Sequence, residues 1–183
     1  MAMNILVNAA ENGIQAMCMS DESSEEQLAR KLVDVGADYD WPILVSDMPK
    51  VEALPTVAAE FCSFYIESFV KLIVIDSIQL LKSDEDADLN TALKRLREIA
   101  KKMDICIIAV SQSTHDGPKG FEDMIPDNII EIYRPGIHSK RPKYRSDLNS
   151  DAVSEIIIRK GRNIGTGFGY VEYAGEGKLA NLE

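Results

Sequence analysis

The sequence has few of the side chains that bind transition metals or form disulfides. Its 183 residues include three cysteines and two histidines, at positions 18, 62, 106, 115 and 138. This scattered spacing matches no pattern of metal ligands. Each cysteine lies in an apolar segment, so we expect Cys18, Cys62 and Cys106 to be buried free thiols in a reducing compartment.

Long hydrophobic runs and a targeting segment are also absent. No apolar window reaches the length of a membrane span, and the first residues, MAMNILVNAAENG, lack the basic start of a signal peptide. We therefore expect a cytoplasmic protein that does not contact a membrane. The net charge of −10 argues against a surface that coats nucleic acid. Basic residues are concentrated in residues 138–146 and 159–162, and the first run is either a solvated hairpin tip or a contact to DNA or a partner subunit.

What is present is an alternation of short apolar runs with amphipathic segments, which is typical of an α/β fold with a parallel sheet. Strands are predicted at residues 14–19, 42–47, 71–76, 105–112 and 129–133, and helices at 23–36, from Pro55 to Phe69, and at 89–103. Ser24 and Gln27 have the spacing of a capping box, and Gly36 ends that helix. Residues 153–160 and 165–173 alternate with period two and predict an antiparallel pair. We expect one domain over residues 1–183, with antiparallel edge strands extending the parallel sheet.

Polar side chains follow three of the predicted strands, at the ends where parallel sheets bind ligands. They are Ser20, Asp21 and Glu22, then Asp76, then Ser111 and Gln112. A carboxylate after an apolar strand can hold hydrated Mg²⁺, and a second one can orient an attacking water. An amide such as Gln112 can sense a terminal phosphate. Each residue alone has a structural explanation, for example Glu22 as a first-turn glutamate, but together they indicate nucleotide hydrolysis.

These motifs, in their order, resemble the RecA-like ATPase domain of DnaB-family replicative helicases. The similar segments are KLIVIDSIQLL (71–81), ICIIAVSQ (105–112), AMCMSDESSEEQLARKL (16–32), IIEIYRP (129–135) and SEIIIRKGRNIGTG (154–167). The resemblance implies ATP and Mg²⁺ as cofactors, with Glu22 as the catalytic glutamate. It places Asp76 at the Walker B position, holding Mg²⁺ through water. Ser111 and Gln112 would then line the nucleotide site.

The resemblance also implies partners. Lys160 and Arg162 match a basic finger that reaches the phosphates of a neighbouring subunit, so identical subunits in a hexameric ring are expected. Single-stranded DNA and a helicase loader or primase are further expected partners. The loop after Gln112 has only Lys119 as a cation, which implies weak DNA contact.

One departure from the family concerns the phosphate loop, G-x-x-x-x-G-K-[ST]. The only Gly-Lys pair, Gly177–Lys178, is followed by Leu179 and does not fit this pattern. In the family the loop and its strand come before the segment that NILVNAAENG (4–13) matches, so we expect both to be missing, with a gap beside the central strands, weak ATP binding and negligible turnover. Three functions stay open: a helicase motor domain, a non-hydrolysing RecA-fold protein that regulates or loads a helicase, and a related recombination or clock-type ATPase. Residues 20–28 and 159–163 favour the helicase branch over the third.

Overall fold

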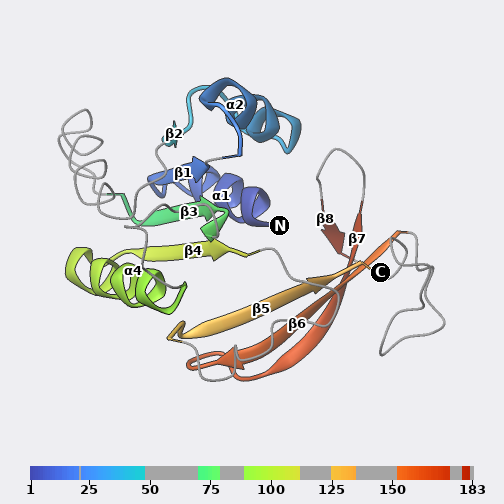
Figure 1. Cartoon of the computed structure of the whole chain (residues 1–183). Coiled ribbons are helices and arrows are strands. Elements are labelled where there is room, and N and C mark those ends of the chain that lie inside the picture. The colour runs from blue at the N-terminus through green and yellow to red at the C-terminus, as the bar shows by residue number, and fades with distance from the viewer. Residues whose placement is uncertain are drawn as a thin grey trace. The chain divides into compact units, whose positions relative to one another are not determined.

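Strands form where apolar and β-branched residues run together, and helices where apolar residues recur every three or four positions. The structure, a computed structural model, describes residues 1–20, 22–47, 70–78, 89–111, 125–134, 152–173 and 179–181. The elements in chain order are α1 (Ala2–Glu11), β1 (Ala16–Ser20), α2 (Glu25–Asp34), β2 (Ile43–Ser46), β3 (Leu72–Asp76), α4 (Leu89–Met103), β4 (Cys106–Val110), β5 (Asn128–Tyr133), β6 (Val153–Gly161), β7 (Gly167–Tyr173) and β8 (Leu179–Asn181) (Figure 1).

The chain divides into two compact units, one of residues 2–119 and one of residues 120–183 with Met1. Each unit contains a four-stranded sheet among its described residues. Sheet A, in the first unit, has the order β2-β1-β3-β4, and sheet B, in the second, has the order β5-β6-β7-β8. That the whole chain forms one domain, as the sequence predicts, stays a prediction.

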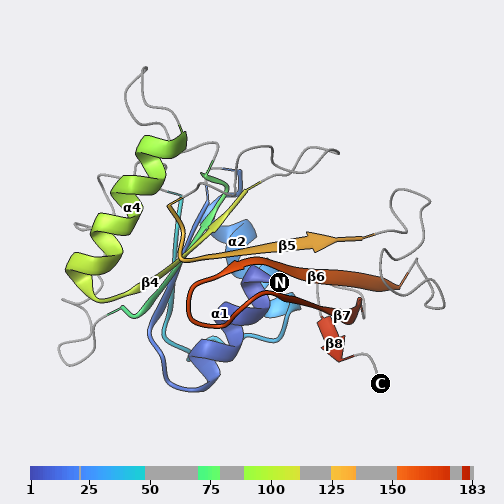
Figure 2. The same ribbon diagram turned by 90° about the horizontal axis from the view of Figure 1, so that it is seen from below.

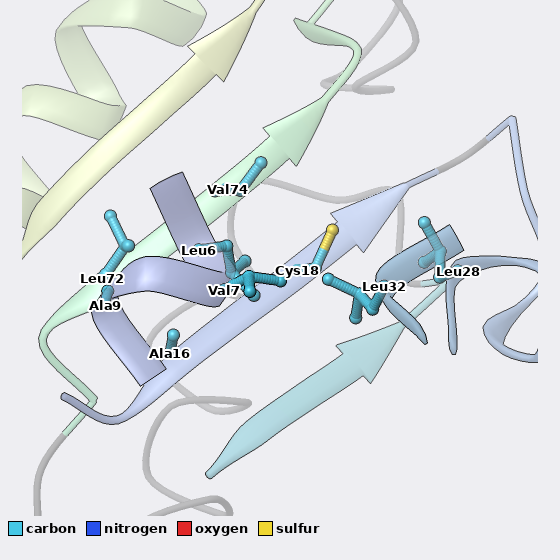
Figure 3. Close-up of a cluster of buried hydrophobic side chains, with 9 residues drawn as sticks. All are labelled: Leu6, Val7, Ala9, Ala16, Cys18, Leu28, Leu32, Leu72 and Val74. Atoms are coloured by element: carbon cyan, nitrogen blue, oxygen red, sulfur yellow. The ribbon is translucent and has the colours of Figure 1, made fainter. Parts of the chain in front are cut away.

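Sheet A is parallel throughout, which confirms the sequence prediction. Its central strand β3 is almost completely buried, with Leu72 to Ile75 each 6% exposed or less. Helix α4 covers one face through Leu96 and Ile99, and α1 and α2 cover the other (Figure 2). Figure 3 shows the second face, where Leu6 of α1 and Leu28 of α2 pack against Cys18 and its neighbours. Burial on both faces explains why the strands are nearly continuous apolar runs.

Helix α2 begins and ends where the sequence predicts. Ser24 and Gln27 form the capping box: the Gln27 N–H donates to Ser24 Oγ at 3.4 Å, and the Ser24 N–H donates to Gln27 Oε1 at 3.1 Å. At the other end Gly36 has φ of +106°, and the N–H of Ala37 donates to the carbonyl of Leu32 at 2.9 Å. This closure needs a left-handed residue, which glycine supplies without strain. The cap fixes α2 directly after Glu22.

Sheet B is antiparallel, and the predicted hairpin of β6 and β7 is confirmed. β5 pairs with β6, and β8, which the sequence analysis did not identify, pairs with β7. The antiparallel strands were expected to extend the parallel sheet, whereas the described residues hydrogen-bond them into a sheet of their own. The alternating exposure along β5 is the physical reason for antiparallel pairing, because such strands bury one face and expose the other.

The expectation of buried thiols is confirmed for one cysteine and wrong for another. Cys18 is buried and free, but Cys106 is exposed, because it begins β4, the outermost described strand on its side of sheet A. Cys62, the predicted helix from Pro55 to Phe69 and the basic run 138–146 lie outside the described residues. None of the described helices is long and apolar enough to cross a membrane.

Candidate functional site

The register of sheet A brings the predicted site residues to one edge. Ser20, the last residue of β1, pairs with Asp76, the last residue of β3. Asp76 in turn pairs with Val110 of β4, and Ser111 follows Val110 directly. Glu22 lies two residues beyond the end of β1. Parallel pairing therefore places these groups at the carboxyl ends of three adjacent strands, where α/β sheets bind ligands.

Hydrogen bonds attach Glu22 to both neighbouring strand ends. Its backbone N–H donates to Ser20 Oγ at 3.2 Å, and its side-chain Oε1 accepts a long hydrogen bond from Ser77 Oγ at 3.5 Å. Ser20 and Ser77 are buried, with 3% and 2% of their surface exposed. The carboxylate of Glu22 consequently lies beside the Asp76–Ser77 segment and not in solvent away from the sheet.

The electrostatics of this edge are those of two close carboxylates. Burial raises the pKa of Asp76, and the negative charge of Glu22 raises it further, whereas the Lys31 ammonium group lowers it. Burial and the charge of Asp76 also raise the pKa of Cys18 to about 12, so this thiol stays protonated and unreactive. A divalent cation bound to Asp76 would relieve the repulsion, since hard oxygen ligands of like charge are what Mg²⁺ binds.

Two residues at this edge were not identified in the sequence analysis. Ser77 follows Asp76 directly, and its hydroxyl donates to Glu22. Lys31 donates from Nζ to Ser23 Oγ at 2.8 Å, and its charge acts on Asp76. The signal for Lys31 was its spacing: it lies two helical turns after Ser24, so it returns to the side of α2 where the helix begins.

The remaining predicted residues are not brought to this edge within the described residues. Lys160 and Arg162 belong to the second unit, in β6 and in the turn after it. The Arg162 guanidinium forms an ion pair with Asp127 at 2.5 Å, and the Arg162 N–H donates to the Asp127 carbonyl at 3.0 Å. Asp21, Gln112 and Lys119 lie outside the described residues.

A preformed metal cage is not part of this edge. Among the residues that the structure describes, no three His, Cys, Asp or Glu side chains are grouped as metal ligands. A cation here would be held by few carboxylates and by water, which is how Mg²⁺ is usually bound next to phosphates.

Solved structures of similar shape cover the whole chain. A DnaB-like replicative helicase superposes with a TM-score of 0.78 and 17% identity over 100% of this chain. An ATPase domain solved by itself gives 0.80 and 17% over 100%. The chain has a RecA-like fold. A KaiC-like protein from the archaeon Pyrococcus horikoshii shares this RecA-like fold, with a TM-score of 0.67 and 18% identity over 98% of the chain.

The chain spans 55% of the DnaB-like helicase, 79% of the ATPase domain and 81% of the KaiC-like protein. No protein-family model matches the sequence, and no curated protein matches it either. At this level of identity the likeness concerns the fold, and the fold class predicted from the sequence is confirmed. In the RecA-like fold of this chain, Glu22 and Asp76 lie at the ligand-binding end of the sheet.

Proposed function

We propose that this chain is the RecA-like motor domain of a DnaB-type, ATP-dependent replicative DNA helicase, with impaired ATP turnover in the 183-residue form. The observation that supports this most is the meeting of Glu22 with Asp76 and Ser77 at the carboxyl edge of sheet A. The full-length likeness to a DnaB-like helicase, at 17% identity, supports the same proposal.

The described residues fit the metal half of a nucleotide site. Asp76 would hold Mg²⁺ through water, and its raised pKa, caused by burial and then by Glu22, is the mark of a carboxylate without enough positive charge nearby. Glu22 would orient the attacking water, since it reaches the same edge from the neighbouring strand. Ser111, at the end of β4, and Gln112 would line the nucleotide. When bound, Mg²⁺ supplies charge neutralisation for the phosphates.

The phosphate half is less complete. The 183 residues contain no G-x-x-x-x-G-K-[ST] motif, whose backbone N–H groups and lysine usually supply most of the grip on phosphates. Lys31 is a cation beside Asp76, but its ammonium group already donates to Ser23 Oγ. We therefore expect ATP affinity to be low, and turnover to be negligible.

Partners are part of the proposal. We infer a ring of identical subunits, in which Arg162 and Lys160 act on a neighbouring nucleotide, and single-stranded DNA as the substrate. Arg162 would have to exchange its pairing with Asp127 for a phosphate, a replacement of one charge-assisted contact by another. The structure of the DnaB-like helicase was described with its interactions with primase, so a primase or a helicase loader is the expected protein partner.

Calorimetry of Mg-ATP binding to the full chain tests the site. We expect a Kd weaker than ~100 µM, or less than about 5.5 kcal/mol of binding free energy, and a further loss in Asp76→Asn. Asp104→Asn is the matched control, because the Asp104 side chain is 97% exposed and lies after α4. Micromolar affinity would contradict the impairment, and equal binding by Asp76→Asn would contradict the assignment of Asp76.

Hydrolysis tests the motor. In an assembly of this chain that turns over ATP on single-stranded DNA, Glu22→Gln should abolish turnover and spare ATP binding. Arg162→Ala should remove turnover while each subunit stays folded, and Arg95→Ala, on the exposed side of α4, is its control. If no assembly hydrolyses ATP but the chain binds a helicase, the non-hydrolysing loader or regulator replaces the motor.

A further inference from the structure

Strand β4 has the sequence of an interior strand and the exposure of an edge strand. Residues Cys106–Val110 read CIIAV, with no charged residue and no proline. In β3, a strand of the same kind, four successive residues are 6% exposed or less, whereas Cys106 is exposed and the other residues of β4 are only half-buried. Among the described strands, β4 pairs with β3 alone. Apolar strands of parallel sheets normally have a neighbour on each side.

The backbone of β4 has hydrogen-bonding groups that face away from β3. The Cys106 N–H donates to the Lys71 carbonyl at 2.9 Å, so Cys106 bonds towards the sheet. In a parallel ladder, successive residues bond alternately to the two sides of their strand. The N–H and C=O groups of Ile107 and Ala109 therefore point to the open edge. Such a row of unpaired groups is a template for another strand.

Both hydrophobic clusters of the first unit reach β4. Ile107 and Ala109 pack against the cluster beneath α4, and Ile108 and Val110 pack against the cluster beneath α1 and α2. A strand added at this edge would continue both clusters, and it must therefore be apolar on both of its faces. The apolar area that it covers adds to the free energy of its hydrogen bonds.

The other outer strand of sheet A is protected by features that β4 lacks. β2 has only four residues, Pro42 precedes it and Asp47 follows it. Shortness, proline and charge are the usual protections of an edge against pairing. This contrast selects β4 as the edge that accepts a strand.

The charge of α4 indicates which kind of chain would bind. This helix packs against β4 and contains five basic residues with one carboxylate, namely Lys94, Arg95, Arg97, Lys101 and Lys102 with Glu98. A second copy paired to β4 across a two-fold axis would bring two such basic helices to the same face of one sheet, and like charges oppose that arrangement. A strand with acidic flanking residues is favoured instead.

We propose that the open edge of β4 binds an extended segment of a partner polypeptide, apolar on both faces of its centre and acidic at its ends. The segment adds a fifth strand to sheet A and pairs with the outward backbone groups of Ile107 and Ala109. It stabilises the first unit and covers the half-exposed side chains of β4.

Amide hydrogen exchange of the full chain, followed by NMR, tests this proposal. The probe is a synthetic peptide of about ten residues, with alternating Val and Ile in its centre and two Glu at each end. We expect exchange at Ile107 and Ala109 to slow by about tenfold or more when the peptide is added. Ile108 and Val110, which bond towards β3, should change much less. A peptide flanked by Lys in place of Glu should bind more weakly, and the difference should shrink in high salt.

Two controls remove the outward hydrogen bonds. The same peptide with N-methyl groups at alternate residues should lose binding to the unmodified chain. Ala109→Pro should lose it as well, because proline removes an N–H that β3 does not use, whereas Ala109→Ser should keep it.

Unchanged exchange at Ile107 and Ala109, or equal binding of the N-methylated peptide, would overturn the proposal. Protection that appears without peptide and grows with protein concentration, together with a dimer mass, would overturn it in favour of a second copy.

Discussion

Sheets A and B are built from similar residues but are buried differently. In sheet A, β3 reads LIVID and its first four residues are 6% exposed or less. In sheet B, β5 reads NIIEIY, and Ile130 and Ile132 are 44% and 45% exposed. The difference comes from the layers: helices cover both faces of sheet A, whereas alternate side chains of β5 remain accessible. Isoleucine content alone therefore does not tell how much a strand contributes to stability.

Truncating one isoleucine in each sheet gives the largest expected contrast. Ile73→Ala should lower the free energy of unfolding by about 3 kcal/mol, because Ile73 is fully buried and the change leaves a cavity. Ile132→Ala should cost less than about 1 kcal/mol, because almost half of that side chain is already in water. Urea unfolding of both variants is the measurement. Equal losses would mean that the Ile132 face is covered in solution.

A glycine pair tests the hairpin of sheet B. A Cβ at Gly161 would overlap the carbonyl of Gly165 and press on the side chain of Ile164. Gly161→Ala should therefore destabilise the turn by about 2 kcal/mol, as for other overpacked sites. At Gly169, in the neighbouring strand, an added Cβ meets nothing within 4 Å, so Gly169→Ala should change stability by less than about 0.5 kcal/mol. Thermal unfolding compares the two, and a tolerated Gly161→Ala would contradict the turn geometry.

The pH dependence of Asp76→Asn tests burial at the edge of sheet A. Burial, and then Glu22, raise the pKa of Asp76 in the folded protein above its ordinary value of 3.8. The folded state thus binds this proton more tightly than the unfolded chain, and the contribution of Asp76 to stability falls as pH rises from 3.8 through the folded pKa. Asp76→Asn should be more stable than the unmodified chain at pH ~7, and the difference should fade towards pH ~4.

Urea unfolding at the two pH values measures this effect of Asp76→Asn. Asp104→Asn is again the control, because its exposed side chain takes part only in a surface ion pair with Lys71. A variant that is less stable than the unmodified chain at neutral pH would show that contacts of the charged Asp76 outweigh its burial.

The smallest expected effect concerns an ion pair of sheet B. Arg159 Nε lies 2.6 Å from Glu131 Oε2, but 48% of the Arg159 side chain is exposed. A double-mutant cycle of Arg159→Ala and Glu131→Ala should give a coupling below about 1 kcal/mol, which vanishes in ~1 M salt. A larger coupling that resists salt would mean that this part of sheet B is shielded from water.

The local elements could largely be predicted because their signals are local. The capping box of Ser24 and Gln27, the stop at Gly36 and the apolar run of β3 are each set by neighbouring residues. The convergence of Ser20, Glu22 and Asp76 at one edge also followed, since parallel strands end together. Ser77 and Lys31 were missed because their roles depend on side-chain directions that periodicity does not report.

The pattern of Cys106–Val110 is equally apolar in the sequence and in the fold, yet its strand is an outer one. Composition reports what a strand can bury, whereas the order of strands decides what it does bury. This is why the exposure of Cys106 was predicted wrongly.

The sequence by itself determined where strands and helices form, that the first sheet is parallel, and which polar groups end its strands, because these follow from periodicity and caps. Only the tertiary structure decided that the antiparallel strands form sheet B and that Glu22 accepts a hydrogen bond from Ser77. It also decided that β4 has an open edge. Pairing partners, burial and electrostatic neighbours depend on contacts between residues far apart in the chain, and no local pattern records them.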